Sequence, residues 1–313
     1  MEARLKMPES VRTMPVLRLD FRLEFAAAVP LAGWPPFTLR GGIGYALRRL
    51  CCTMGRSGCG DCPRHGDCFY SWLFETPVAP GSRLFGAHDR APHPFVLVPG
   101  AVTGRELDFG IILFGEAVRA AALFASALRD LAEDGLGQHR EPFRLARITV
   151  SGAERQVWQP GRPEPRIRPG TLEQFLAPGD EDDTAPLAVN LLTPLRLQVR
   201  RGINREPAFR DLLAAALRRT STLCFYYGGM ELDLPWRDLL DAAADVPTLK
   251  ADLVWQPLER RSSRTERIMP SGGLVGRLVF APAARAFLPH LLPATVTGLG
   301  KQTVFGLGRI GTG

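Results

Sequence analysis

The chain has few lysines and no long apolar run. Lys6, Lys250 and Lys301 are the only lysines among its 39 Lys and Arg residues, so arginine carries almost all of the positive charge. No stretch of about 18 consecutive apolar residues is present, which argues against a membrane span. The first 16 residues carry charges throughout and lack the apolar core of a secretory signal, so we expect a cytoplasmic protein without membrane partners.

The chain does have an apolar content high enough for folded domains, and a net positive charge. Its 313 residues are 45% hydrophobic, which excludes a disordered chain and suggests two domains of ordinary size. The formal net charge is +7. Arginine binds phosphate in a bidentate manner and stacks on bases, so this charge favours a nucleic-acid partner. A coding sequence rich in G and C would also enrich arginine, and that explanation stays open.

A segment near the end of the sequence is rich in glycine. Five of the fourteen residues from Gly298 to Gly311 are glycine, and Lys301 and Arg309 add positive charge. Glycine lets a phosphate approach the backbone closely, and successive backbone N–H groups can form an anion site. The segment does not match the GxxxxGK[ST] pattern of a P-loop. It predicts either a site for a polynucleotide backbone or a flexible turn.

The two halves of the chain show the same order of expected elements. Residues 16–28 alternate between apolar and charged side chains, as in a half-buried strand, and the helix at 39–53 follows. Two strands, a helix and a strand come next, and residues 187–311 repeat this order. The order strand, helix, strand, strand, helix, strand is typical of the ferredoxin-like fold.

We therefore predict an α+β protein made of tandem ferredoxin-like (RRM-like) domains. The N-terminal domain covers residues 1–150, with a cysteine-rich insertion at 51–75 after its first helix. Residues 151–186 are rich in proline, glycine and charge and form a linker. The C-terminal domain covers residues 187–313 and contains the glycine-rich loop at 298–308.

A smaller glycine-rich basic loop, residues 135–140, precedes the last strand of the first domain. The loop at 298–308 has the same place in the second domain. This repetition favours a structured loop over a flexible tail.

Five of the six cysteines lie between residues 51 and 68. In a cytoplasmic chain, clustered thiols favour a structural zinc or iron–sulfur cluster over disulfides. The predicted ligands are Cys52, Cys59, Cys62 and Cys68, and His65 lies within the same stretch of sequence. The CxxC pair is a good half-site, whereas the other spacings fit no standard zinc module, so an ordinary cysteine-rich loop is the alternative. No dinucleotide or P-loop motif accompanies the cysteines, which disfavours a redox or nucleotide enzyme.

Several strings resemble, in the family's order, the repeat-RNA-processing endoribonucleases of the RAMP superfamily of CRISPR-associated proteins. The strings are Leu39–Cys51, the cysteine loop up to Tyr70, His93–Leu97, Leu192–Arg196, Arg261–Arg264, Gly272–Gly276 and Gly300–Gly308. The last of these is the most specific. The resemblance spans about residues 16–311.

The resemblance implies an enzyme that binds the repeat of precursor CRISPR RNA (crRNA) and cuts it once without a metal. The upstream 2′-hydroxyl attacks the adjacent phosphorus, the 5′-oxygen leaves, and a 2′,3′-cyclic phosphate remains. The mature crRNA is then retained for an effector complex with other CRISPR subunits. The alternative is a catalytically inactive crRNA-binding subunit. A divergent member, such as those of type IV CRISPR systems, could cut slowly by alignment and charge alone.

The catalytic residues are the least defined part of the resemblance. Many relatives carry a histidine just before the Gly-Lys of the terminal loop, where this chain has Gly298 and Leu299. Our candidates for catalysis are Tyr45, Arg48, His139 and Lys301. Tyrosine and arginine are poor bases at neutral pH, so their expected role is to align the attack and stabilise charge.

The predicted RNA-binding set consists of arginines and of residues in the terminal loop. RNA hairpins are read through shape, phosphates and flanking unpaired bases, which suits arginine. A solvated helix face is the alternative for part of the set. Its members are Arg40, Arg49, Arg200, Arg201, Arg205, Arg210, Arg218, Arg219, Arg260, Arg261, Arg264, Arg267, Gly300, Lys301, Gln302 and Arg309.

Overall fold

The computed structural model divides the chain into two compact units. The N-terminal unit holds Pro15–Gly170, and the C-terminal unit holds Thr171–Gly313 together with Met1–Met14. These boundaries differ from the expected ones, because the residues before the first strand group with the C-terminal unit and residues 151–170 group with the N-terminal unit. The structure describes residues 6–31, 33–55, 58–60, 62–76, 91–158, 166–177, 182, 184–199, 202–261 and 267–313.

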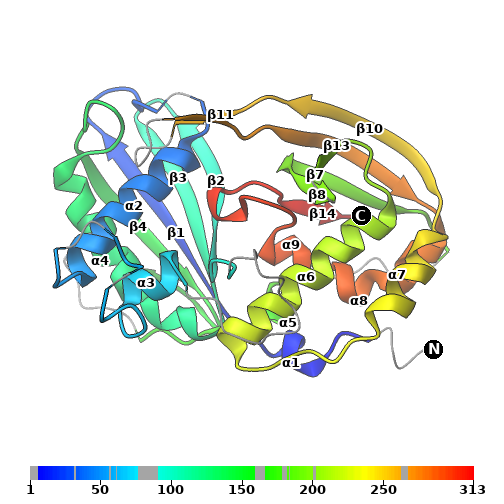
Figure 1. Cartoon of the computed structure of the whole chain (residues 1–313). Helices are drawn as coiled ribbons and strands as arrows, with labels where there is room; N and C mark the ends of the chain where they lie inside the picture. Colours follow the sequence, from blue (N-terminus) through cyan, green and yellow to red (C-terminus); the bar gives the residue numbers. More distant parts are fainter. Residues whose placement is uncertain are drawn as a thin grey trace. The chain divides into compact units, whose positions relative to one another are not determined.

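The N-terminal unit is an antiparallel sheet with two long helices on one face (Figure 1). Its strands follow the order β2-β3-β1-β4-β5. In chain order the elements are β1 (Pro15–Phe25), α2 (Pro35–Cys51), α3 (Phe69–Phe74), β2 (Phe95–Thr103), β3 (Glu106–Phe114), η2 (Gly115–Ala120), α4 (Ala121–Asp134), β4 (Phe143–Ser151) and β5 (Arg155–Trp158). β5 lies within the stretch that was expected to be a linker, and it pairs with β4.

The alternating pattern of β1 explains how this sheet is built. Leu17, Leu19, Phe21 and Leu23 are buried, whereas the charged residues between them are half-buried. Two of the three glycines in the middle of α2 serve packing. A Cβ at Gly42 would lie 2.9 Å from Leu131 of α4, and a Cβ at Gly44 would lie 2.9 Å from the Phe74 ring of α3. Both helices therefore approach α2 closely because these positions carry no side chain.

The C-terminal unit repeats the arrangement, with the sheet order β10-β13-β7-β14. Its main elements are β7 (Leu187–Leu195), α6 (Phe209–Gly228), α7 (Trp236–Ala244), β10 (Thr248–Gln256), β13 (Gly273–Phe280), η3 (Pro282–Phe287), α8 (Leu288–Leu291), α9 (Pro293–Thr297), η4 (Thr303–Phe305) and β14 (Ile310–Thr312). Smaller elements of this unit are α1 (Glu9–Arg12), α5 (Leu172–Phe175) and the hairpins β8 (Leu197–Val199) with β9 (Gly202–Asn204) and β11 (Glu259–Arg261) with β12 (Ile268–Pro270). The short strand β6 (Gly170–Thr171) pairs with β1.

In both units the first strand lies inside the sheet. β1 lies between β3 and β4 in the N-terminal unit, and β7 lies between β13 and β14 in the C-terminal unit. This is the ferredoxin-like topology, so the predicted fold class is confirmed. The core of the C-terminal unit forms where α6 places Phe209, Leu213 and Leu217 against the sheet residues Leu278 and Phe280. Among the described residues, no helix is both long and apolar enough to cross a membrane.

Candidate RNA-binding and catalytic site

The terminal glycine-rich loop, Gly298–Gly308, is an ordered part of the C-terminal unit. It lies between α9 and β14, and its four glycines have φ angles between +70° and +77°. The Lys301 N–H donates to the Arg196 carbonyl at 2.9 Å, and the Leu299 N–H donates to the Gly308 carbonyl at 2.8 Å. These bonds, and the complete burial of Leu299, give the loop a defined conformation.

The loop presents positive charge from this ordered backbone. Lys301 is exposed, and the next residue, Gln302, has a left-handed φ of +65°. Arg309 follows the loop, and its N–H donates to Thr193 Oγ1 at 2.9 Å. An exposed ammonium group beside a fixed glycine backbone can bind a phosphodiester, since both the charge and the close approach are available.

Two arginines hold the loop, and the sequence assigned neither to this role. Arg196 links two segments, because its carbonyl accepts from Lys301 while its Nη1 donates to the Gly272 carbonyl at 2.9 Å. The Arg260 guanidinium lies 4.7 Å from the centroid of the Phe305 ring. Burial lowers the pKa of Arg260. Arg260 was predicted to contact RNA, but its half-buried guanidinium packs against the loop instead. The sequence pointed to Arg196 only as the last residue of Leu192–Arg196, one of the strings that resemble the endoribonuclease family.

Helix α2 carries Tyr45 and Arg48 one turn apart. Tyr45 is 63% exposed. The Arg48 guanidinium lies 6.0 Å from the centroid of the Tyr70 ring on α3. Arg40, from the RNA-binding set, lies similarly, 4.6 Å from the centroid of the Phe74 ring. Arg40 and Arg48 thus lie against aromatic rings of α3, and α2 also carries an exposed phenol at Tyr45.

The other predicted catalytic residues come from loops. His139 is exposed in the loop after α4, in the same unit as Tyr45. Lys301 belongs to the C-terminal unit. The structure thus brings Tyr45 and Arg48 together on one helix, while His139 and Lys301 lie in two separate glycine-rich loops.

Several arginines of the predicted RNA-binding set have partners inside the protein. Arg49 forms ion pairs with Asp130 and Asp134 of α4, so α4 neutralises its charge. Arg219 is buried and its Nε donates to the Thr297 carbonyl at 3.3 Å. Burial lowers its pKa to about 10. The prediction that Arg219 contacts RNA is wrong, because its guanidinium is enclosed by the protein.

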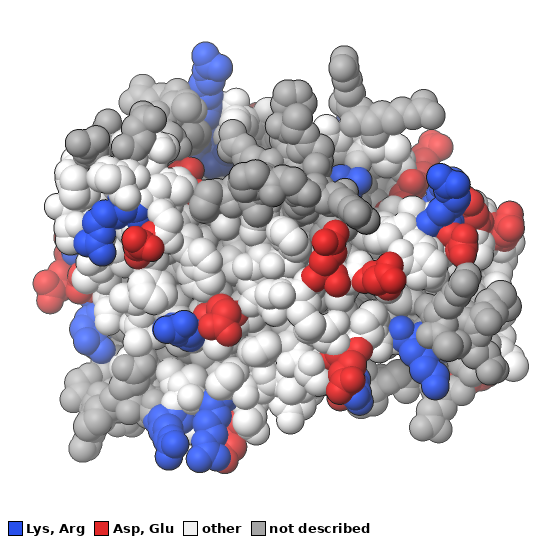
Figure 2. Space-filling view, turned by 60° about the horizontal axis from the view of Figure 1, so that its bottom comes forward, with Lys and Arg blue, Asp and Glu red and all other residues white. Residues whose placement is uncertain are grey.

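Other arginines of the predicted RNA-binding set are more exposed to solvent than Arg219. Arg218, Arg261 and Arg267 are exposed. The Arg205 guanidinium lies 4.3 Å from the centroid of the Trp255 ring, and Arg210 forms an ion pair with Asp241 at 3.6 Å. Arg200, Arg201 and Arg264 lie outside the described residues. On the face drawn in Figure 2, arginines and lysines are interspersed with carboxylates.

The predicted cysteine ligands lie around one small cavity. Cys52, Cys59, Cys62 and Cys68 line it together with His65, and its volume is about 20 Å³. All these cysteines are free thiols. The N–H groups of Met54 and Gly55 lower the pKa of Cys52. Yet in the part of the chain that the structure describes, no three His, Cys, Asp or Glu side chains form a group that could hold a metal ion. The structure does not support the predicted zinc or iron–sulfur cluster.

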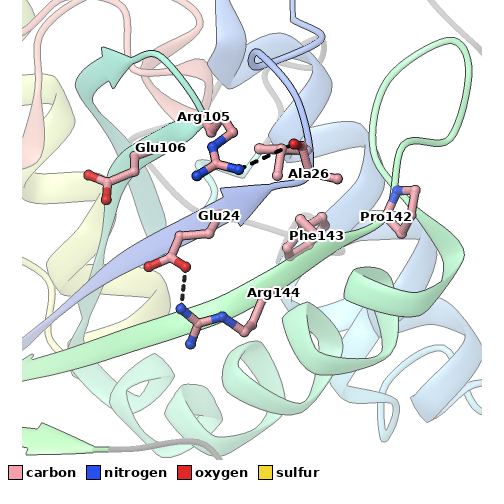
Figure 3. A pocket seen from close by; sticks show the side chains of 8 residues that line it. Glu24, Ala26, Arg105, Glu106, Pro142, Phe143 and Arg144 are labelled. Atoms are coloured by element: carbon pink, nitrogen blue, oxygen red, sulfur yellow. Dashed lines mark hydrogen bonds and ion pairs between the residues drawn. The ribbon is translucent and has the colours of Figure 1, made fainter.

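An open groove of about 490 Å³ lies at one end of the N-terminal sheet (Figure 3). Its lining residues come from β1, β3, β4 and the segments that flank them: Glu24, Phe25, Ala26, Arg105, Glu106, Pro142, Phe143 and Arg144. Arg144 forms an ion pair with Glu24, and Arg105 Nη1 donates to the Ala26 carbonyl at 3.5 Å. The sequence analysis missed Arg105 and Arg144, because only strand pairing brings these distant residues to one groove.

Two family models match the chain, and together they cover most of it. Residues 189–310 match the model of the CRISPR-associated endoribonuclease Cas6. Residues 14–171 match the model AF_1859_N, described as an N-terminal domain. No curated protein sequence matches the chain.

The fold resembles solved structures of Cas6. The product complex of Cas6 (TTHB231), a Thermus thermophilus protein, has a TM-score of 0.59 and 18% identity, over 95% of this chain and 98% of that one. The product complex of Cas6 (TTHA0078) has a TM-score of 0.52 and 21% identity, over 95% and 99%. A chain of a partial Cas6-RT-Cas1–Cas2 complex has a TM-score of 0.55 and 12% identity, over 96% of this chain and 46% of that one.

These structural likenesses concern the fold, and the family models concern the sequence. The residues matched by the two models, 14–171 and 189–310, fall largely within one unit each. Residues 189–310 belong to the Cas6 family, and this match, together with the likeness of the fold over both units, indicates a CRISPR-associated, repeat-RNA-processing protein.

Proposed function

We propose that this protein binds CRISPR repeat RNA and cleaves precursor crRNA once within each repeat. The observation that carries the proposal is the terminal loop, whose ordered glycine backbone presents Lys301 to solvent inside the domain that matches Cas6. Two of the similar Cas6 proteins are described as product complexes, which supports an RNA-processing role for this fold.

The proposed reaction is attack of the upstream 2′-hydroxyl on the adjacent phosphorus, with the 5′-oxygen as leaving group. The protein must hold the three reacting atoms in line and stabilise the extra negative charge on phosphorus. Lys301 supplies that charge stabilisation from the terminal loop. In the N-terminal unit, Tyr45 and Arg48 are our candidates for aligning the RNA, and His139 is our candidate for proton transfer.

Product analysis tests this proposal directly. We expect repeat RNA, transcribed from the CRISPR arrays of the genome that encodes the chain, to be cut in EDTA and to end in a 2′,3′-cyclic phosphate. A 2′-deoxy substitution at the cut site removes the nucleophile, so it should abolish cleavage without abolishing binding. Tight binding with no cleavage would instead favour the inactive crRNA-binding subunit.

We propose further that catalysis uses no metal. The 2′-hydroxyl chemistry requires only alignment, proton transfer and charge stabilisation. Cleavage in EDTA tests this, and cleavage that stops on chelation would contradict it.

The mature crRNA is proposed to remain bound for an effector complex with other CRISPR subunits. Arginines and the ordered terminal loop support retention, since phosphate contacts contribute much of the affinity for RNA. Sequencing the RNA that copurifies with the protein should recover repeat-derived 3′ ends. Recovery of unrelated RNA alone would argue against retention.

A further inference from the structure

The two units contain the same three-residue turn. Gly135–Gly137 follows α4 and Gly298–Gly300 follows α9, and each is Gly-Leu-Gly. The φ angles of the first pair of glycines are +82° and +85°, and those of the second pair are +75° and +77°. Leu136 and Leu299 are both buried. The terminal loop therefore has a structural counterpart in the N-terminal unit.

Backbone bonds from the central leucine close both loops. The Leu136 N–H donates to the Glu141 carbonyl at 2.9 Å, and the Glu141 N–H donates back at 3.0 Å. In the terminal loop, the Leu299 N–H donates to the Gly308 carbonyl at 2.8 Å. The loop Gly135–Glu141 is thus as firmly closed as the terminal loop, although it is shorter.

Each loop also holds one non-glycine residue in a left-handed conformation. Arg140 has a φ of +52° and Gln302 has a φ of +65°, and they are the two such residues among those that the structure describes. This conformation is unfavourable for residues with a side chain and is retained where the structure requires it. Gln138, His139 and Arg140 are all exposed, so the short loop presents polar and positive groups to solvent, as Lys301 does in the long one.

The open groove begins where the short loop ends. Pro142, Phe143 and Arg144 follow the loop directly and line the groove, and Figure 3 shows Arg105 across the strand from them. Arg144 is paired with Glu24, whereas the hydrogen bond of Arg105 among the described residues is a long one of 3.5 Å to the Ala26 carbonyl. A volume of about 490 Å³ is sufficient for a small polar ligand and falls within the usual range for binding pockets.

We propose that the loop Gly135–Glu141 and the groove beside it form a second RNA-backbone site, in addition to the terminal loop. The ligand is a single-stranded segment of the repeat RNA, with one phosphate at Arg140 and a neighbouring phosphate at Arg105. Arginine suits both positions, because it binds phosphate in a bidentate manner. This inference rests on the proposed function, since it assumes that the protein binds repeat RNA.

The substitution Arg140→Gly tests the site without endangering the fold. Glycine accepts a φ of +52° more readily than arginine, so the melting temperature should stay the same or rise. Removal of one phosphate contact should weaken binding of fluorescein-labelled repeat RNA by about tenfold. The slope of log Kd against log salt concentration should fall in magnitude by about 1. Arg105→Ala should act in the same direction, and it remains informative if Arg140→Gly alters the loop.

Arg119→Ala is the matched control, because it removes the same charge from an exposed site at the other end of the sheet. Arg119 lies in η2, just after Phe114, which pairs with Val16 at the start of β1. Phe143, next to the short loop, pairs with Phe25 at the end of β1. We expect Arg119→Ala to leave the affinity and the salt slope close to those of the unaltered protein.

The outcomes separate the two claims. If the unaltered protein binds no repeat RNA, the proposed function fails. If it binds, and Lys301→Ala weakens binding while Arg140→Gly and Arg105→Ala behave like Arg119→Ala, the second site is refuted and the proposed function stands.

Discussion

The two glycine-rich loops start with the same turn and then differ. The short loop closes on Glu141 directly after three exposed residues, whereas the long loop adds a helical turn at Thr303–Phe305 and two more left-handed glycines before it closes. The long loop is also held from outside, by Arg196 and by Arg260. The same turn thus has supporting arginine contacts from outside the loop in the C-terminal unit. We interpret that support as the requirement of a site where charge must be placed accurately.

The largest difference between the loops is expected in catalysis. Lys301→Ala should lower the single-turnover cleavage rate at saturating protein by about 10²-fold, the usual cost of removing one group that stabilises transition-state charge. Arg140→Gly should lower affinity but leave the saturated rate nearly unchanged. Rapid-quench cleavage assays measure both rates. Equal losses of saturated rate would mean that the two loops contribute equally to the chemistry, contrary to this comparison.

Stability should reveal what the loops share. A Cβ at Gly135 would overlap the Arg140 carbonyl, and a Cβ at Gly308 would overlap the Leu299 carbonyl. Gly135→Ala and Gly308→Ala should each lower the free energy of unfolding by more than about 1 kcal/mol, because both positions also need a positive φ. Urea denaturation measures the loss. Gly311→Ala is the control, since its Cβ would meet only Leu192, at 3.7 Å. If Gly135→Ala leaves the free energy of unfolding unchanged, the two loops are not structurally equivalent.

Two neighbouring arginines of α6 allow a smaller comparison. Arg219 is buried and bonded to the Thr297 carbonyl, whereas Arg218 is exposed. Arg219→Ala should lower the free energy of unfolding by about 1–3 kcal/mol, because it removes packing and leaves a buried acceptor. Arg218→Ala should change it by less than about 0.5 kcal/mol. The same urea experiment distinguishes them, and similar values for the two variants would contradict the buried position of Arg219.

The smallest effects concern the thiols. The pKa of Cys52 is lowered by backbone N–H groups, whereas burial raises the pKa of Cys224 to about 12. At pH 8, iodoacetamide should modify Cys52 first and Cys224 only after unfolding, because the thiolate is the reactive form. Above pH 9 the unfolded state loses the Cys224 proton while the folded state keeps it, so this thiol should lower stability as pH rises toward 12. Mass spectrometry of alkylated peptides checks the order, and early labelling of Cys224 would contradict it.

Local patterns predicted the order of elements and the two loops, because strand alternation, helix periodicity and glycine content are local properties. They did not predict which arginines reach solvent. Arg218 and Arg219 are adjacent on one helix, and only packing against Thr297 shows that the second is buried. Arg49 meets Asp130 and Asp134 only through the contact between α2 and α4. The groove arginines, Arg105 and Arg144, come together through the pairing of β1 with β3 and with β4. The cysteine spacing suggested a metal site, but the described thiols are not arranged in a group that could hold a metal ion.

The closing strand β14 has a consequence for folding. It pairs with β7, the first strand of the same fold, and the Arg309 N–H meets the Thr193 hydroxyl across 116 residues of sequence. Contacts between such distant residues form slowly, because the entropy of closing a long loop opposes them. The terminal loop lies immediately before β14. Its backbone donates hydrogen bonds to the carbonyls of Pro194 and Arg196, which follow the part of β7 that pairs with β14. The conformation of the terminal loop is therefore expected to be among the last features to form, so we expect a nascent or partly folded chain to bind RNA weakly.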